Sequence, residues 1–312
     1  MIELKTMTIN SAADGLPLSV LYAEAEEPKG VLQCCHGMVE HKERYEKFLM
    51  FVAEKGYHVY IHDMRGHGAS VKSPEDLGYF YKGNPLNCVE DLKTINDHLH
   101  EKYPDLPVFL FGHSMGSLEV RAYCKRYDDT ISGLIVCGSP SYNKATSMGH
   151  LMVKALRLVR GERHRSKMLN NIALGSYNEP FIKESPSVNN WLSVDRENIA
   201  EYDRDPLCGY IFTLNGFDVL MNLMKEVYAR PGWFIKNRKM PVLFISGEDD
   251  PCRAGDEGFN YAVDLMKHIG YENTTSKLYP GLRHEILREE PERSAEVMTD
   301  IVDALDTWRS NV

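Results

Sequence analysis

The chain has 312 residues and a formal net charge of −9, with 43% hydrophobic and 26% charged residues. This composition is ordinary for a globular protein with a large core, and the length suits one α/β domain with an insertion. The acidic balance argues against general nucleic-acid binding, because such binding depends on phosphate neutralisation by lysine and arginine.

The first residues and the cysteines predict a cytoplasmic protein. The opening stretch MIELKTMTIN lacks the basic and apolar regions of a secretion signal. No apolar run approaches the roughly 20 residues that span a bilayer. Since the 7 cysteines are odd in number and none shows CxxC spacing, we expect reduced thiols and no metal site.

In chain order, the predicted elements begin with an antiparallel hairpin. Two short strands flank Asp14-Gly15, a turn signal. Apolar strands then alternate with amphipathic helices, which predicts βαβ units and a parallel sheet covered on both faces. The expected strands are 4–10, 16–23, 30–37, 57–63, 107–114 and 131–140, and the expected helices are 44–56, 87–103 and 115–127.

After residue 140 the alternation stops, and it resumes near residue 240. The intervening stretch contains helices and loops but no convincing buried strand. Two further strands (240–250 and 274–281) and two helices (257–270 and 292–310) follow. We therefore predict an α/β fold with a doubly wound, mostly parallel sheet, whose core comprises residues 1–140 and 239–312, with residues 141–238 as an insertion.

The clearest chemical signal is the sequence GHSMG at residues 112–116. It matches G-x-S-x-G directly after a strand and directly before a helix, which is the context of a nucleophile elbow. The glycines permit the sharp turn, and the helix N-terminus favours developing negative charge. A chance match on a loop would lack this context, so we predict that Ser114 is a nucleophile.

A nucleophilic serine needs a base, and the base needs an orienting acid. On this topology the chain order is serine, acid, histidine. The loop after the first strand beyond the insertion offers Asp249 or Asp250, and the loop after the last strand offers His284. Two backbone N–H groups should hold the oxyanion, one from Met115 and one from Met38 in the loop after the strand VLQCC.

At this point the sequence resembles α/β-hydrolases of the monoacylglycerol lipase and lysophospholipase type, the serine aminopeptidase S33-like group. The resemblance is carried by HGMVEHKERY (36–45), DMRGHGAS (63–70), GHSMG (112–116), GEDD (247–250) and GLRHEI (281–286). It covers both core segments, whereas within the insertion only EYDRDPLCGYIFT (201–213) resembles the family.

The resemblance implies an α/β-hydrolase fold with a helical cap over the site, formed by the insertion 141–238. It implies Ser114, Asp250 and His284 as nucleophile, orienting acid and base, with no metal or organic cofactor. Asp250 is selected because it is the fourth residue counting from Gly247, and the following proline biases it toward an extended conformation. Loop residues that would hold structure around the pocket are Glu40, Arg44, Arg65 and His67.

Two stretches of the insertion have helical periodicity. One stripe contains Met148, Leu151, Met152, Ala155, Leu156 and Val159, and a second contains Phe217, Leu220, Met221, Met224 and Tyr228. Basic residues lie on the opposite face of the first helix and beyond it (Lys154, Arg157, Arg160, Arg163, Arg165 and Lys167). Packing on the core with a solvated basic face is one interpretation.

The other interpretation is an adaptable wall for an acyl chain, with the basic stretch steering the protein to anionic lipid at a membrane surface. The candidate substrate-binding residues are then Met148, Leu151, Met152, Phe217, Met221 and Met224.

We predict a serine hydrolase that cleaves a lipid-like carboxylic ester, such as a monoacylglycerol or lysophospholipid, through an acyl-enzyme. A short-chain or aryl esterase and a ligand receptor that retains the triad are alternatives. An aminopeptidase is another, and it would need cap carboxylates to hold the free amine (Glu197, Glu201, Asp203 or Asp205). The oligomeric state is not set by the sequence.

Overall fold

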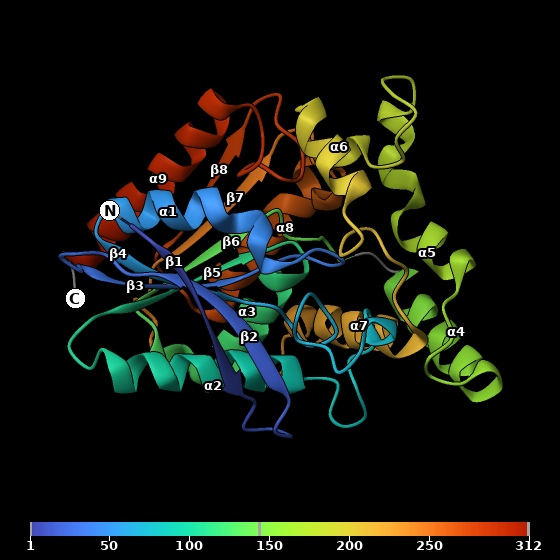
Figure 1. The fold of residues 1–312 in the computed structure, drawn as a ribbon, viewed down its shortest axis with the longest axis horizontal. Coiled ribbons are helices and arrows are strands. Elements are labelled where there is room, and N and C mark those ends of the chain that lie inside the picture. Colours follow the sequence, from blue (N-terminus) through green and yellow to red (C-terminus); the bar gives the residue numbers. More distant parts are fainter. Residues whose placement is uncertain (1, 143–144, 311–312) are drawn as a thin grey trace.

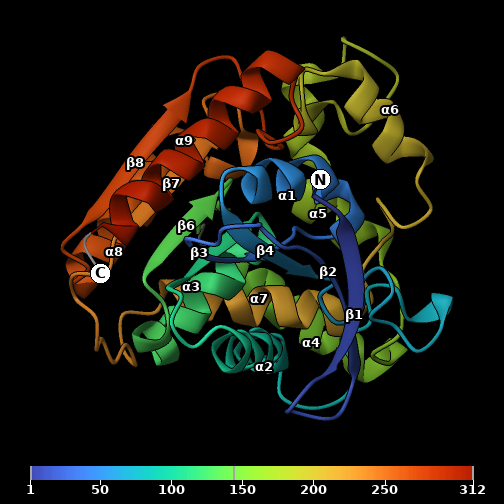
Figure 2. The same cartoon turned by 60° about the vertical axis from the view of Figure 1, so that its left-hand side comes forward.

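The computed structural model describes residues 2–142 and 145–310. Within these ranges one sheet of 8 strands has the order β1-β2-β4-β3-β5-β6-β7-β8. The strands are β1 (Leu4–Asn10), β2 (Pro17–Ala23), β3 (Gly30–Cys35), β4 (Tyr57–His62), β5 (Val108–His113), β6 (Gly133–Cys137), β7 (Val242–Gly247) and β8 (Thr274–Tyr279). The edge strands β1 and β8 lie at opposite sides of the molecule (Figure 2).

Strand directions confirm the predicted mostly parallel sheet with an N-terminal antiparallel hairpin. β1 pairs antiparallel with β2, and β2 pairs antiparallel with β4. The remaining neighbours are all parallel. Strands β3 to β6 are buried along their whole length, as expected for apolar runs covered by helices on both faces.

Helices cover the two faces of the sheet in separate groups (Figure 1). α1 (Glu46–Glu54) and α9 (Pro291–Arg309) share one hydrophobic cluster with one face of the sheet. α2 (Asn87–Lys102), α3 (Met115–Tyr127) and α8 (Gly255–Ile269) share the cluster on the other face. The carboxyl ends of β3, β5, β7 and β8 lead into the loops that carry the predicted site residues.

The insertion leaves the sheet after β6 and returns at β7, although these two strands are hydrogen-bonded neighbours. Its helices are α4 (Ala145–Arg160), α5 (Lys167–Leu174), α6 (Arg196–Arg204) and α7 (Leu214–Tyr228), with the 3₁₀ helices η4 (Gly175–Phe181) and η5 (Asn190–Leu192). α4 and α5 lie at one end of the molecule, on the right in Figure 1. None of the helices in the described ranges has the length and apolarity needed to cross a bilayer.

The face that α4 presents to the protein differs from the predicted stripe. His150 Nε2 lies 2.9 Å from Asp218 Oδ1 of α7, and Arg157 donates a bond of 2.5 Å to the other oxygen of Asp218. These polar contacts turn His150 and Val153 inward. Met148 and Leu151 are consequently 71% exposed, whereas Met152 and Leu156 stay partly buried against the core. Only part of the predicted stripe therefore faces outward, and Arg157 of the predicted solvated face is bound to Asp218.

Candidate active site

The elbow between β5 and α3 has a strained backbone at Ser114. Its φ of 53° and ψ of −118° lie in a region that non-glycine residues rarely occupy, at a cost of about 1–3 kcal/mol. The flanking glycines are required by close backbone approaches. A Cβ on Gly112 would lie 2.4 Å from the Gly116 carbonyl oxygen, and a Cβ on Gly116 would lie 2.4 Å from that of Cys35.

Asp250 and His284 form a buried hydrogen-bonded pair. His284 Nδ1 lies 2.9 Å from Asp250 Oδ2, and both residues are 2% exposed. The Cys252 N–H and the Ser246 hydroxyl also donate to the carboxylate, at 2.8 and 3.1 Å. Burial opposes ionisation of Asp250, but His284 and these donors outweigh it and lower the pKa of the carboxyl. Asp249 is exposed and makes no such contact with His284.

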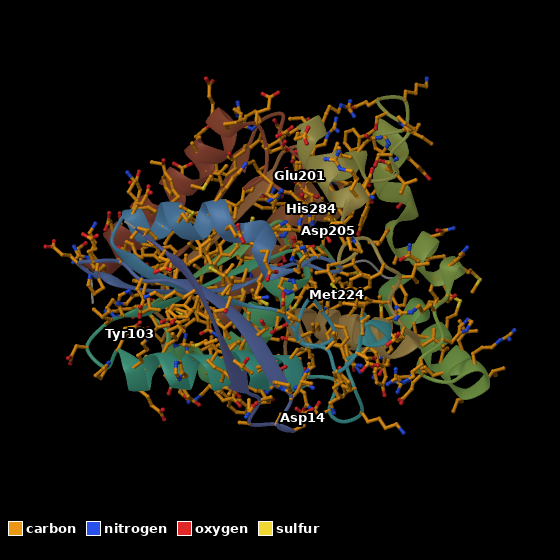
Figure 3. The ribbon with its side chains drawn as sticks, in the orientation of Figure 1. Asp14, Tyr103, Glu201, Asp205, Met224 and His284 are labelled. Atoms are coloured by element: carbon orange, nitrogen blue, oxygen red, sulfur yellow. The ribbon has the colours of Figure 1, made fainter. Side chains whose placement is uncertain are left out.

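Several of the predicted site residues line one cavity of about 500 Å³. This volume is typical of small-molecule sites. Its lining includes Ser114, His284, Met38 and Met115 from the core, and Phe217, Met221 and Met224 from α7. Figure 3 shows His284 and Met224 on the side of the molecule that faces α4 and α5, with Tyr103 toward the opposite end. Met148, Leu151 and Met152 do not line this cavity.

The loop after β3 lies against the serine. A Cβ on Gly37 would be 3.1 Å from Ser114 Cβ. Gly37 N–H donates to Glu40 Oε1 at 2.5 Å, and Val39 N–H donates to His67 Nε2 at 3.2 Å. These bonds fix the turn that carries Met38 into the cavity lining. Glu40 and His67 therefore hold the loop conformation.

Buried charges connect this loop to the histidine loop and to the insertion. Arg44 donates to Glu40 at 3.2 Å and to Glu285 at 2.6 Å. Asn198 of α6 donates to the same Glu285 oxygen at 2.7 Å. Burial opposes the charge of Glu40, but His113 and Arg44 outweigh it and lower the pKa of Glu40 well below its usual range.

His113, the variable residue of the elbow, has a partner at each ring nitrogen. Its Nδ1 lies 3.2 Å from Glu40 Oε1 and 3.0 Å from the Tyr45 hydroxyl. Its Nε2 lies 3.1 Å from the carbonyl oxygen of His284. Although burial opposes its charge, Glu40 raises the pKa of His113. An imidazolium suits this place because it donates to the carboxylate and the carbonyl together.

Arg65 lies away from the cavity. Its Nε donates to Asp91 at 2.6 Å, and its Nη1 donates to Asp14 at 2.9 Å in the turn between β1 and β2. The side chain is 1% exposed. Arg65 therefore ties the loop after β4 to the hairpin turn and to α2.

Two groups of side chains in the described residues have a composition that could bind metal. One consists of Asp250, Cys252 and His284, in which the aspartate and histidine already pair. In the other, with Cys208, His41 has Glu43 at 2.7 Å from Nδ1 and Asp205 at 2.8 Å from Nε2. With both nitrogens bonded to carboxylates, an imidazolium bridge fits this group better than a metal ion.

The four acidic residues that the sequence offered for an amine-binding site are engaged elsewhere. Glu201 pairs with Arg288 at 2.5 Å, and Asp205 pairs with His41. Glu197 pairs with Arg204, and Asp203 accepts a hydrogen bond from Asn189. None of the four acidic residues belongs to the cavity lining among the described residues.

Trp191 is a site residue that the sequence did not reveal. It lines the cavity, and its ring centroid lies 4.9 Å from that of His284. The surrounding NNWLS has neither helical nor strand periodicity, so no local pattern marks it. A lone aromatic residue in an irregular stretch is a weak signal, and only the tertiary structure joins it to His284.

The chain is similar to known hydrolases over most of its length. The family model described as serine aminopeptidase, S33, matches residues 26–291. A monoacylglycerol lipase of Mycolicibacterium smegmatis is 28% identical over 90% of this chain and 88% of the relative. A phospholipase of Bacillus subtilis is 26% identical over 86% of this chain and 93% of that protein.

Solved structures agree with the fold. A thermostable carboxyl esterase from Bacillus coagulans, in complex with glycerol, superposes with a TM-score of 0.88 at 25% identity, covering 98% of this chain and 99% of that one. Monoglyceride lipase from Saccharomyces cerevisiae superposes with a TM-score of 0.73 at 19% identity, covering 98% and 97%.

Proposed function

Because the chain belongs to the serine aminopeptidase S33 family of α/β-hydrolases, we propose that it hydrolyses lipid-like carboxylic esters such as monoacylglycerols or lysophospholipids. The observation that carries the proposal is the pairing of His284 with Asp250 at the edge of a cavity that also contains Ser114. The lipase and phospholipase relatives support an ester substrate with an acyl chain.

The proposed reaction has two similar halves. His284 takes the proton from Ser114 Oγ as that oxygen attacks the ester carbonyl, while Asp250 stabilises the imidazolium. The N–H groups of Met38 and Met115 hold the oxyanion. The alcohol leaves with the proton from His284, and the acyl group stays on Ser114. Water, deprotonated by His284, then attacks the acyl carbonyl. The bond to Ser114 Oγ breaks, His284 returns the proton to that oxygen, and the carboxylic acid is released.

The cavity favours an apolar acyl group over a short or strongly polar one. Phe217, Met221 and Met224 contribute apolar surface, and methionine adapts to chains of different shape. We propose that residues 141–238 act as a cap that supplies this wall. A short-chain or aryl esterase would leave much of the cavity of about 500 Å³ unfilled.

Amine recognition is less well supported. An aminopeptidase would need a free carboxylate near the scissile bond, and the four acidic residues considered for that role are engaged in other contacts. The test is to compare p-nitrophenyl esters of increasing acyl length with an aminoacyl p-nitroanilide. We expect the rate constant kcat/KM to rise with acyl length. Faster cleavage of the amide would contradict the proposal.

A receptor that retains the triad would resemble this structure but would lack an activated serine. We expect a fluorophosphonate probe to label the wild-type protein at Ser114. The Ser114→Ala variant should not be labelled, and mass spectrometry of a slow ester substrate should find the acyl group on the same peptide. Absence of labelling throughout pH 6 to 9 would favour the receptor.

We also propose peripheral contact of a cytoplasmic protein with an anionic membrane surface. The exposed part of the α4 stripe includes Leu151 and Val159, and exposed Lys154 and Arg160 lie on the same helix. Cation and apolar surface together suit an anionic bilayer. Wild-type protein should cosediment with vesicles that contain phosphatidylserine, and Leu151→Glu should bind less. Equal binding to purely zwitterionic vesicles would contradict the electrostatic part.

A further inference from the structure

Trp191 makes a direct ring contact with His284. The indole belongs to η5 in the insertion, is 9% exposed, and lies 4.9 Å from the imidazole centroid with an interplanar angle of 41°. Tyr177 of η4 contacts the indole in turn, at 5.2 Å between centroids. His113 contacts His284 at 4.7 Å. The imidazole is therefore bordered by rings from the insertion and from the elbow.

Hydrogen bonds join the segment around Trp191 to the loop that carries His284. Arg283, which precedes His284, donates to the carbonyl oxygens of Asn190 at 2.7 Å and Ser193 at 3.1 Å. Glu285, which follows it, donates its N–H to the carbonyl oxygen of Leu192 at 2.7 Å. The residues on each side of His284 thus form hydrogen bonds with residues on each side of Trp191.

A buried carboxylate reinforces the same junction. Glu289 is 3% exposed. Its Oε1 accepts from the N–H of Arg283 at 2.9 Å, and its Oε2 accepts from the Ser193 hydroxyl at 2.6 Å and from the Val194 N–H at 2.8 Å. The segment around Trp191 is consequently fixed to the core loop, although it belongs to the insertion.

We propose that Trp191 is a positioning residue for the general base, an inference that rests on the proposed function of His284. The hydrogen bond to Asp250 holds Nδ1, but the terminal torsion of a histidine ring is soft. The indole restricts that torsion and keeps Nε2 aimed toward Ser114. It also displaces water from the imidazole, which strengthens the interaction between His284 and Asp250 in a less polar surrounding.

Trp191 would differ in its effect on catalysis from the rest of the cavity wall. Met221 would contact the acyl chain and not His284, so shortening it should mainly change KM. Trp191 would act through His284, so shortening it should mainly change kcat. A misplaced base is costly because an error of about 1 Å in reacting geometry can reduce the rate on the order of 100-fold.

The experiment compares Trp191→Leu and Trp191→Phe with Trp233→Leu. Trp233 donates to the Ala229 carbonyl oxygen and contacts Tyr271, and it does not line the cavity. We expect Trp191→Leu to lower kcat roughly 10- to 100-fold with KM within about 3-fold. Trp191→Phe should retain most of the wild-type kcat, because it keeps a flat ring beside His284. Trp233→Leu should retain the full wild-type kcat.

A spectroscopic measurement covers the case in which Trp191→Leu does not fold. In a Trp233→Phe, Trp308→Phe background, Trp191 is the single tryptophan, and its emission reports on the imidazole that it contacts. We expect His284→Gln to change the emission of Trp191 at constant pH, while His113 and Asp250 remain. Unchanged emission would overturn the positioning role, because that role requires the indole to rest against the imidazole.

Other outcomes distinguish the two proposals. If fluorophosphonate labels wild-type Ser114 but Trp191→Leu keeps wild-type kcat, the positioning role is wrong and the proposed function stands. If Trp191→Leu raises KM at unchanged kcat, Trp191 is only part of the substrate wall. If the wild-type protein neither labels nor turns over esters, the proposed function fails first.

Discussion

Arg44 Nη2 lies 2.6 Å from Glu285 Oε2, and this buried contact joins the loop after β3 to the loop after β8. Arg44→Ala would leave Glu285 and Glu40 without their shared cation. Loss of one partner of a buried pair costs about 3–5 kcal/mol, so we expect a matching fall in the free energy of unfolding. Urea denaturation measures it.

The control for Arg44→Ala is Arg204→Ala on α6. Arg204 pairs with Glu197, and their side chains are 69% and 73% exposed. Exposed ion pairs contribute little, so this variant should unfold near the wild-type midpoint. Equal losses in the free energy of unfolding would show that the buried Arg44 contact stabilises the protein no more than the exposed pair does.

The two adjacent aspartates should differ sharply in their effect on turnover. Asp250→Asn keeps the shape of the side chain but removes the charge that faces His284. The expected loss in kcat is on the order of 10⁴-fold, as for other triads that lose this charge. Asp249→Asn should stay near wild type in the same ester assay, because Asp249 is exposed. Reversed losses would reassign the acid by one residue.

Gly116→Ala should damage both folding and activity. The added Cβ would lie 2.4 Å from the carbonyl oxygens of Cys35 and His36, and overpacking of this kind costs about 1–3 kcal/mol. Gly149→Ala on α4 is the control, because its Cβ would meet nothing within 4 Å. Thermal unfolding should show a lower midpoint for Gly116→Ala alone.

The His41 bridge predicts a pH dependence of folding. Burial opposes its charge, but hydrogen bonds to Cys208, Glu43 and Asp205 raise the pKa of His41 from 6.5 to about 11. A raised pKa contributes stability that is fully present below pH 6.5 and declines as pH rises toward 11. The difference in urea midpoint between wild type and His41→Asn should therefore shrink from pH 6 to pH 9. A difference that grows would contradict this sign.

Much of the fold followed from local patterns. Apolar runs such as 108–113 form strands because the helices on both faces bury them, and the hairpin lies where Asp14-Gly15 predicted a turn. The choice of Asp250 over Asp249 rested on motif spacing and stays a prediction. In the structure Asp250 is buried beside His284, and Asp249 is exposed.

The packing of the insertion was harder to predict from the sequence, because polar contacts between residues far apart in the chain determine it. Periodicity predicted the α4 helix, but the contacts of His150 and Arg157 with Asp218 determine which face is buried. A hydrophobic stripe cannot reveal a partner 60 residues or more away. The ring contact of Trp191 with His284 depends on such a distant pairing too, which is why no local pattern predicted it.

The adjacency of β6 and β7 has a consequence for the order of folding. Their ladder pairs Leu134 with Val242 and Cys137 with Ile245, so it closes a loop of about a hundred residues, and closure entropy grows with loop length. Contacts between distant segments form slowly. We therefore expect strands β1 to β6 to associate before β7 and β8 join, and a chain arrested before β7 would expose the β6 edge to other chains.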